Sequence, residues 1–463
     1  MRFFEWAITI YFLISFIYLF IQKQLSKKVK LVLIIILLTL LLGHMTFESL
    51  RWQMGGIYFL SLILIIKLFF PIKKQLLKIL SLTLQLLIIM LTIILLILFP
   101  INQVPPLTGN YQVGTISFDL VDENRIEIYG NDDTSLRKIR VQMWYPTDDT
   151  SGTKDYWISD GKFVSEQIAS FVNLPGFLSD YVSVIKSNSF INASLAKNLN
   201  QIPVIIISHG WTSMRDLHTD YAEMLASNGY LVLGIDHTYG SLGVVFDDGS
   251  EVKLNSEALL NANDKNFLSS ANQLVDTYYQ DDQLVVDYLD TINQEKSSFS
   301  QFANKIDIDN IGILGHSTGG GGAVKLALNN SKIKAVMGLD AWVEPLSVST
   351  IAKNLNTPAL FLRSEQWSDG PNNINLSQIV KNATSDPKVY QINGTIHQDF
   401  SMLYMFDPLG KYFGLSGTVD SDLDREIQNA FILNFFNHNL KNETFNSDDL
   451  ASEYSIVDKV NFQ

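Results

Sequence analysis

Four long apolar stretches fill the first hundred residues of this 463-residue chain. They run approximately over Phe3–Ile21, Leu31–Phe47, Met54–Phe70 and Ile79–Phe99. Each is close to the ~20 residues that an α-helix needs to cross a hydrocarbon core of about 30 Å. We therefore expect residues 1–100 to be an all-α transmembrane anchor of about four helices that bind the lipid bilayer.

The charges between these stretches predict an orientation. Two of the connections are rich in lysine: Lys23, Lys27, Lys28 and Lys30 in the first, and Lys73, Lys74 and Lys78 in the third. The middle connection carries only Arg51, which Glu48 balances. Because positively charged loops stay in the cytoplasm, we expect a multi-pass protein of the cell membrane. The large domain that follows is then extracytoplasmic.

A change of pattern follows the fourth stretch. Residues 101–114 form the expected linker, because Pro105-Pro106 and Gly109-Asn110 break helices and favour turns. Three later runs alternate between apolar and polar residues, as antiparallel strands do: Thr115–Val121, Arg125–Tyr129 and Ile139–Tyr145. Six further runs are continuously apolar: Val204–Ser208, Leu231–Ile235, Ile311–Leu314, Ala335–Leu339, Ala359–Leu362 and Val389–Ile392. Continuous runs of this length suit a parallel sheet that is covered on both faces.

Helical patterns separate these runs, at Asp216–Ser227, Ala271–Asn293, Gly320–Leu328 and Asp422–His438. Alternation of strands and helices predicts an α/β domain with a mostly parallel central sheet and helices on both faces. We expect this domain to span residues 115–445, with a C-terminal tail over residues 446–463.

Two segments do not fit the alternation. Residues 150–200 are amphipathic and aromatic. This predicts a lid or an acyl-side wall over a pocket, or else an ordinary helical insertion that packs on the sheet. Residues 238–264 follow a strand end, where α/β enzymes place substrate contacts.

Charge and composition narrow the classes of function. The first hundred residues carry ten Lys or Arg and two acids, so the remaining 363 residues have a net charge of −21. A domain this acidic argues against a nucleic-acid partner, because phosphates would repel it. The chain has no cysteine, which excludes disulfides, thiolate metal sites and a cysteine nucleophile. The sequence implies no metal and no organic cofactor, and it does not identify protein partners.

The pentapeptide Gly315-His316-Ser317-Thr318-Gly319 is the most informative motif of the domain. It matches G-x-S-x-G, and it lies between a strand-like run and a small-residue helix start. A sharp turn from strand to helix exposes the serine hydroxyl beside a base and amide donors, and the glycines allow the strained backbone. Ser317 is therefore the candidate nucleophile.

A serine nucleophile needs a general base, and imidazole is the usual one because its pKa lies near neutrality. The chain has seven histidines: His44, His209, His218, His237, His316, His397 and His438. In the α/β-hydrolase fold the catalytic histidine follows the serine and lies after the last strand. Only His397 meets both conditions. His316 belongs to the turn itself and is expected to point away from the nucleophile.

The third member of such a triad is an acid between serine and histidine, at a strand end. Asp340 ends the run Ala335–Leu339, and Glu365 and Asp369 follow the next strand. Position favours Asp340 only slightly, because an aspartate there is often a helix cap. For the oxyanion hole, the backbone N–H of Thr318 is one candidate donor, and that of Trp211, in Ser208-His209-Gly210-Trp211, is the other.

These residues together resemble the platelet-activating-factor acetylhydrolase family of α/β-hydrolase serine esterases over about residues 111–440. The resemblance lies in short motifs: Arg140–Pro146, Ser208-His209-Gly210, Gly315-His316-Ser317, Leu339-Asp340-Ala341-Trp342, Ser364-Glu365 and Ile396-His397-Gln398. It implies an α/β-hydrolase fold and calcium-independent hydrolysis of short or oxidised acyl groups from the sn-2 position of phospholipids. In that family the aspartate of the Leu-Asp-Ala-Trp stretch is the triad acid, which implies Asp340 here.

Two features depart from that resemblance. The glycines Gly319–Gly322 after the turn are similar to those of bacterial polyester hydrolases and cutinases, and the membrane module has no counterpart in the secreted enzymes. The sequence hypothesis is a membrane-anchored serine esterase that acts on a phospholipid or another ester through Ser317, Asp340 and His397. The alternatives are an esterase for non-lipid esters and a non-catalytic membrane receptor on a hydrolase fold.

Overall fold

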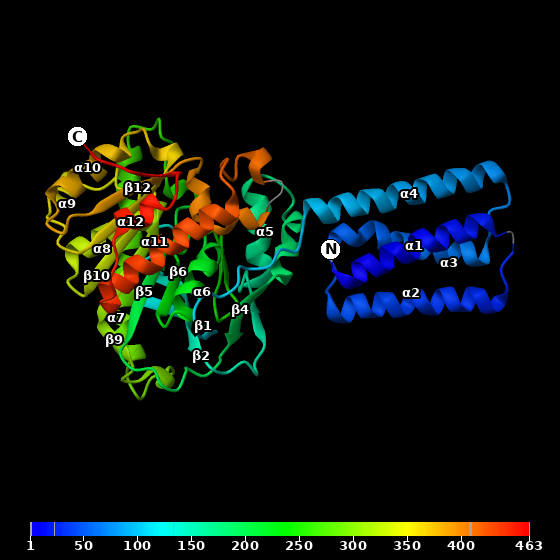
Figure 1. Cartoon of the computed structure of the whole chain (residues 1–463), viewed down its shortest axis with the longest axis horizontal. Coiled ribbons are helices and arrows are strands. Elements are labelled where there is room, and N and C mark those ends of the chain that lie inside the picture. Colours follow the sequence, from blue (N-terminus) through cyan, green and yellow to red (C-terminus); the bar gives the residue numbers. More distant parts are fainter. Residues whose placement is uncertain (1, 23, 133, 407–409, 463) are drawn as a thin grey trace.

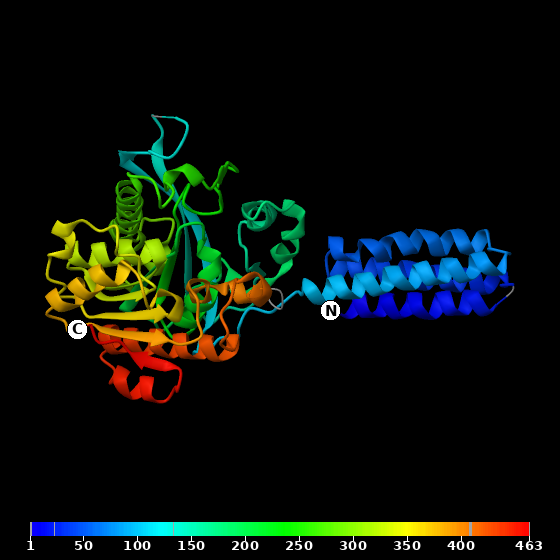
Figure 2. The same cartoon turned by 90° about the horizontal axis from the view of Figure 1, so that it is seen from above.

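The computed structural model describes residues 2–22, 24–132, 134–406 and 410–462. Lys23 of the predicted inner loop lies outside the described residues. Figures 1 and 2 show two parts, a rod of four helices that stands out from one side of a larger α/β domain. The N-terminus lies at the end of the rod that is nearer the domain.

The rod is the predicted membrane module. Its helices are α1 (Phe3–Ile21), α2 (Lys27–Phe47), α3 (Gly55–Phe69, preceded by the 3₁₀ turn η1 at Trp52–Met54) and α4 (Gln75–Leu98). All four are long and apolar enough to cross a membrane, and many of their apolar side chains are exposed. Because water disfavours such a surface, the helices indicate membrane association.

A buried ion pair joins the helix ends next to the domain. Arg51 lies between α2 and α3, and its guanidinium donates to both carboxylate oxygens of Glu5 at 2.7 Å. The same guanidinium donates to the carbonyl oxygen of Phe99, 2.8 Å away, at the end of α4. Arg2 also donates to Glu5. The only two acids of the module are thus at this end, since Glu48 lies 3.0 Å from His44 there.

The domain is built on an eleven-stranded sheet in the order β13-β12-β11-β10-β9-β5-β6-β2-β1-β4-β3. The strands are β1 (Gln112–Ile126), β2 (Leu136–Thr147), β3 (Lys154–Tyr156), β4 (Lys186–Ile191), β5 (Ile202–Ser208), β6 (Leu231–Asp236), β9 (Ile306–His316), β10 (Ile333–Leu339), β11 (Ala359–Ser364), β12 (Lys388–Ile392) and β13 (Val457–Lys459). The centre from β6 to β12 is parallel, whereas β2 pairs antiparallel with both β6 and β1. The predicted α/β fold, with its mostly parallel sheet, is confirmed.

Helices cover both faces of this sheet. They are α6 (Thr219–Ser227), α7 (Phe267–Ile292), α8 (Ser317–Asn329), α9 (Val348–Ile351), α10 (Asn372–Asn382), α11 (Ser421–Lys441) and α12 (Ser447–Ser452). Successive residues of β5 point to opposite faces. Ile206 packs with residues of α7 and α8, and Ile207 packs with residues of α6 and α11. Both faces of the strand are buried, which explains its continuously apolar sequence.

The segment 150–200 belongs to the side of the domain that faces the rod (Figure 1). It contains β3, α5 (Gly161–Phe171), two 3₁₀ turns, η2 (Gly176–Leu178) and η3 (Asp180–Val184), and β4. The Trp52 ring contacts the Phe177 ring edge-on at 5.7 Å, and Phe99 contacts Tyr181 at 5.8 Å. The segment therefore packs against the helix ends of the membrane module.

Two expectations about element boundaries need correction. Arg125–Tyr129 is not a separate strand, because β1 continues to Ile126 and turns into β2. The expected tail 446–463 holds α12 and β13, and β13 pairs antiparallel with β12 at the edge of the sheet. The excursion 238–264 contains a short hairpin of β7 (Gly243–Val245) and β8 (Glu251–Lys253).

Candidate active site

Ser317 occupies a tight turn between β9 and α8. Its φ angle is +54°, a conformation that few non-glycine residues adopt. The flanking glycines permit close backbone approach, because a Cβ atom on Gly315 would lie 2.4 Å from the carbonyl oxygen of Gly319. A Cβ atom on Gly319 would lie 2.2 Å from the carbonyl oxygen of Ser208. The turn has the geometry that holds a serine side chain clear of its own backbone.

His397 and Asp340 meet beside this turn. His397 begins the 3₁₀ turn η8 (His397–Phe400) after β12, and Asp340 directly follows β10. The Nδ1 atom of His397 lies 3.0 Å from Oδ2 of Asp340. Because a carboxylate only accepts, Nδ1 carries the proton, and Nε2 is left with its lone pair. Ser364 fixes the carboxylate with its backbone N–H at 2.7 Å and its hydroxyl at 2.6 Å.

The other two acid candidates are elsewhere. Glu365 is exposed and accepts the backbone N–H of Gly394 at 2.6 Å, so it supports the loop before His397. Asp369 is also exposed. Of the three candidates, the structure brings only Asp340 to the imidazole.

Two residues that the sequence reasoning missed hold His397 in place. The Trp367 ring is stacked on the imidazole with an interplanar angle of 1° and 4.3 Å between centroids. The side-chain oxygen of Gln366 accepts the backbone N–H of His397 at 2.7 Å. Both belong to η7 (Glu365–Trp367), just after β11. Their only sequence signal is their position after a strand end.

His316 links the nucleophile turn to the histidine loop. Its Nε2–H donates to the carbonyl oxygen of His397 at 3.1 Å, and the two rings lie 4.7 Å apart. Its side chain thus lies toward the histidine loop, and the expectation that it points away from the nucleophile stays a prediction. Burial keeps the pKa of His316 well below its ordinary value, so the ring is neutral. The described contacts of Ser317 include no hydrogen bond to His397.

The expected oxyanion donors lie beside the serine. A Cβ atom on Gly210 would be 3.4 Å from Oγ of Ser317, which brings the loop after β5 against the nucleophile. Within the described part of the chain, the backbone N–H groups of Trp211 and Thr318 donate to no other group. Free amides at the start of a helix and on a facing loop are the donors that a developing oxyanion needs.

A second Ser-His-Asp row lies deeper in the domain. The ring of His237 donates from Nδ1 to Asp281 at 3.0 Å and accepts at Nε2 from the hydroxyl of Ser208 at 2.9 Å. All three residues are 0% exposed. Burial alone would raise the pKa of Asp281, but hydrogen bonds and charge from Arg137 and His237 outweigh it and hold that pKa well below its ordinary value. No ester can reach this row, so we interpret it as structural.

The remaining histidines do not reach the nucleophile. His209 is buried and bonded to Ser241, and His218 is buried against Tyr221. Burial lowers the pKa of His218 to about 3. His44 lies in the membrane module, and the ring of His438, on α11, is bonded to the Glu443 carbonyl.

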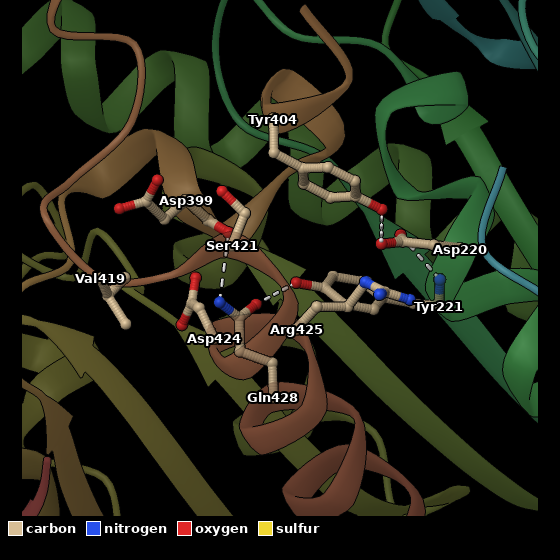
Figure 3. Close-up of a pocket in the computed structure, with 9 residues that line it drawn as sticks. All are labelled: Asp220, Tyr221, Asp399, Tyr404, Val419, Ser421, Asp424, Arg425 and Gln428. Atoms are coloured by element: carbon tan, nitrogen blue, oxygen red, sulfur yellow. Dashed lines mark hydrogen bonds between the residues drawn. The ribbon is translucent and has the colours of Figure 1, made fainter. Parts of the chain in front are cut away.

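A small pocket lies under the histidine loop (Figure 3). Asp399, two residues after His397, binds the backbone N–H groups of Ile396 and Gly417. Asp220 and Asp424 face the same pocket. Burial raises the pKa of Asp220 to about 6 and that of Asp424 to about 7. Among the described residues, no group of three His, Asp or Glu side chains is placed to hold a metal ion.

The comparisons with known proteins place this geometry in a family. Residues 96–456 match the family model "Platelet-activating factor acetylhydrolase, isoform II". The chain belongs to this family. The bovine platelet-activating factor acetylhydrolase (Bos taurus) is 24% identical over 73% of this chain and 78% of its own length.

Other relatives act on different esters. Cutinase est1 of Thermobifida alba is 26% identical over 39% of this chain and 45% of its own length. A ferulic acid esterase from Streptomyces cinnamoneus has the same fold, with a TM-score of 0.64 and 20% identity over 78% of this chain and the whole of that one. Membership of the acetylhydrolase family establishes the chain as a serine ester hydrolase.

Proposed function

We propose that this acetylhydrolase-family member is a membrane-anchored esterase that removes short or oxidised acyl groups from phospholipids. Its triad is Ser317, His397 and Asp340. The observation that carries the proposal is the 3.0 Å contact between His397 and Asp340 beside a serine at φ +54°. An oriented imidazole next to a strained serine turn is the arrangement that activates a hydroxyl.

The reaction follows from these positions. The Ser317 oxygen attacks the ester carbonyl, and its proton passes to Nε2 of His397, which the bond to Asp340 leaves unprotonated. The amides of Trp211 and Thr318 stabilise the oxyanion. The alcohol leaves with the proton from His397, and an acyl-Ser317 ester remains. Water then gives its proton to His397 and attacks that ester, which frees the fatty acid and restores Ser317.

The surroundings of the histidine loop support a lipid substrate. The loop continues into η9 (Met402–Phe406), where the Met405 carbonyl accepts a hydrogen bond from Asn102 of the linker at 2.7 Å. The histidine loop is thus tied to the chain that leaves the membrane helices. An anchored site beside a bilayer meets lipid at a high effective concentration.

The segment 150–200 adds an apolar surface on the same side. Phe171, Val172, Leu174 and Phe177 are exposed, and Phe177 also touches Trp52 at the end of the rod. Exposed apolar side chains next to membrane helices favour contact with the lipid interface. We propose that this segment is an interfacial wall of the substrate path, and that the lysine loops place it on the outer side of the membrane.

An acyl-chain series on the full chain in detergent micelles tests the proposal. The substrates are phosphatidylcholines with sn-2 acetyl, hexanoyl or palmitoyl groups, and Ser317→Ala is the blank. We expect the acetyl ester to be hydrolysed fastest. Preference for the palmitoyl ester would overturn the short-acyl assignment but leave the esterase intact.

The cutinase and ferulic acid esterase relatives favour a second candidate, hydrolysis of non-lipid esters. Methyl ferulate and a soluble polyester oligomer, assayed beside the phosphatidylcholines, separate the two. Higher kcat/KM on either of them would assign the enzyme to non-lipid esters. No turnover of any ester would instead favour a receptor on a hydrolase fold.

A further inference from the structure

A partly open cavity of about 570 Å³ lies between the helices. It is at the end of the rod away from the domain (Figure 1). The walls come from all four helices and from the two connections at this end. Of the residues that the structure describes, four lysines line it: Lys30 of α2, Lys67 of α3, Lys73 of the α3–α4 connection and Lys78 of α4. Apolar side chains such as Leu19 and Phe20 complete the wall.

The positive charge of the cavity is not balanced by acidic side chains of the described residues. Among the described residues, no carboxylate lines it and none forms an ion pair with these four lysines. The only acids of the module, Glu5 and Glu48, are engaged at the opposite end of the rod. A group of ammonium ions in a confined space repel one another, so the cavity favours a bound anion.

The surroundings of Lys67 give the strongest argument for a bound anion. It lies within the last turn of α3, where a lysine side chain is costly unless it has a polar partner or reaches the interface. Its Nζ donates to the side-chain oxygen of buried Gln85, 3.0 Å away, and lies 5.6 Å from the centre of the Phe16 ring. Both partners are uncharged, and the ammonium charge is therefore not neutralised by protein.

We propose that this cavity binds a phosphate-bearing anion, with Lys30, Lys67, Lys73 and Lys78 around the phosphate oxygens. The apolar wall favours an anionic phospholipid, whose headgroup would occupy the cavity while its chains lie along the helices. Basic pockets between membrane helices bind lipid headgroups in this way. The site is remote from Ser317. A negative result for anion binding would therefore leave the proposed esterase function unaffected, and the reverse also holds.

Native mass spectrometry and thermal unfolding of the full chain in neutral detergent test the site. The probes are phosphatidylglycerol, phosphatidylcholine with the same acyl chains, and glycerophosphoglycerol, the deacylated headgroup. We expect phosphatidylglycerol to stay bound and raise the Tm, and the other two to do neither. Equal binding of glycerophosphoglycerol would assign the phosphate site to a soluble ester. Equal binding of phosphatidylcholine would overturn the proposal.

A pair of matched double variants locates the site. Lys67→Gln/Lys78→Gln removes two charges from the cavity, and Lys27→Gln/Lys28→Gln removes two from exposed positions at the same end. We expect the first to weaken phosphatidylglycerol binding at least about tenfold and the second to change it little, because only the cavity lysines contact the phosphate. Equal losses would mean surface attraction only and would overturn the proposal.

Both double variants should retain turnover of a soluble ester, which verifies that the catalytic domain is folded. If Lys67→Gln/Lys78→Gln does not fold, Lys30→Gln provides the same test. Unchanged phosphatidylglycerol binding in Lys30→Gln and in Lys73→Gln would likewise overturn the site.

Discussion

The α/β domain contains two rows of the same three residue types, and they differ in exposure and in the backbone geometry of the serine. The members are Ser317, His397 and Asp340 in the outer row and Ser208, His237 and Asp281 in the inner row. In both rows the imidazole donates from Nδ1 to an aspartate at 3.0 Å. The inner row even has the closed serine–histidine hydrogen bond, 2.9 Å long. Hydrogen bonding alone therefore does not distinguish a catalytic triad.

Access and backbone geometry make the difference. Ser208 ends a regular strand and is completely buried, and its neighbours leave no room for an ester. Ser317 stands at a turn with positive φ and is partly exposed, and among the described residues the amides of Trp211 and Thr318 donate to no other group. Asp281 differs from Asp340 as well, since Arg137 and Arg125 bind it as ion pairs. The inner row joins the end of β5, the residue after β6 and α7, and Arg137 extends it to β2. We infer that it stabilises the loop after β5.

The largest expected difference is between the two serines. Ser317→Ala should lower kcat by about 10⁴-fold or more, because the nucleophile is lost, and it should leave the Tm within a few degrees of wild type. Ser208→Ala should keep kcat within about tenfold and cost about 1 kcal/mol of stability from a lost buried hydrogen bond. Esterase kinetics and thermal unfolding measure both. Loss of turnover in Ser208→Ala with an unchanged Tm would contradict the structural role of the inner row.

The acids give the next test. Asp340→Asn should reduce kcat by about 10⁴-fold, since the imidazole would be held in the wrong tautomer. Asp369→Asn is the matched control, because Asp369 is exposed after the neighbouring strand, and it should leave kcat unchanged. If Asp369→Asn proves to be the damaging change, the acid has been assigned to the wrong residue.

The substitution Asp281→Asn tests whether the inner row contributes to stability and not to catalysis. Removing this carboxylate leaves the buried guanidinium of Arg137 with only Glu127 as an ionic partner. Breaking a buried pair costs about 3–5 kcal/mol, so denaturant unfolding should show a large loss. The remaining folded enzyme should keep its kcat per active site, titrated with a fluorophosphonate. A normal unfolding free energy would show that the inner row is not structural.

The smallest effect concerns pH. Burial raises the folded-state pKa of Asp424 to about 7, above its unfolded value near 4. The folded state therefore binds the Asp424 proton more tightly than the unfolded state does. The protonated carboxyl group contributes stability that is fully present below pH 4 and is lost as the pH rises through 7. The stability of wild type should decline between pH 5 and 8, and Asp424→Asn should remove about 2.6 kcal/mol of that decline. A Tm profile parallel to that of wild type would contradict the shift.

The sequence predicted the parts of this account that depend on local pattern. The six continuous apolar runs became the parallel strands from β5 to β12, because strands buried on both faces require such residues. Chain order and position after the last strand together predicted His397 as the base. Position alone favoured Asp340 only slightly over Glu365 and Asp369 as the triad acid. The family motif Leu-Asp-Ala-Trp was the stronger argument for Asp340.

What the sequence did not predict depends on contacts between distant segments. The stack of Trp367 on His397 and the bond from His316 to the His397 carbonyl join loops from three strand ends. The pairing of Arg137 with Asp281 spans 144 positions. The cationic cavity likewise forms only when the two lysine connections fold against each other at one end of the rod.

Labelling of the full chain with a fluorophosphonate probe, followed by peptide mapping, tests the central claim most directly. We expect a single modified serine, Ser317, with labelling lost in Ser317→Ala, strongly reduced in His397→Ala and kept in Ser208→Ala. Modification of Ser208, or no modification of a folded and esterase-active protein at Ser317, would contradict the account.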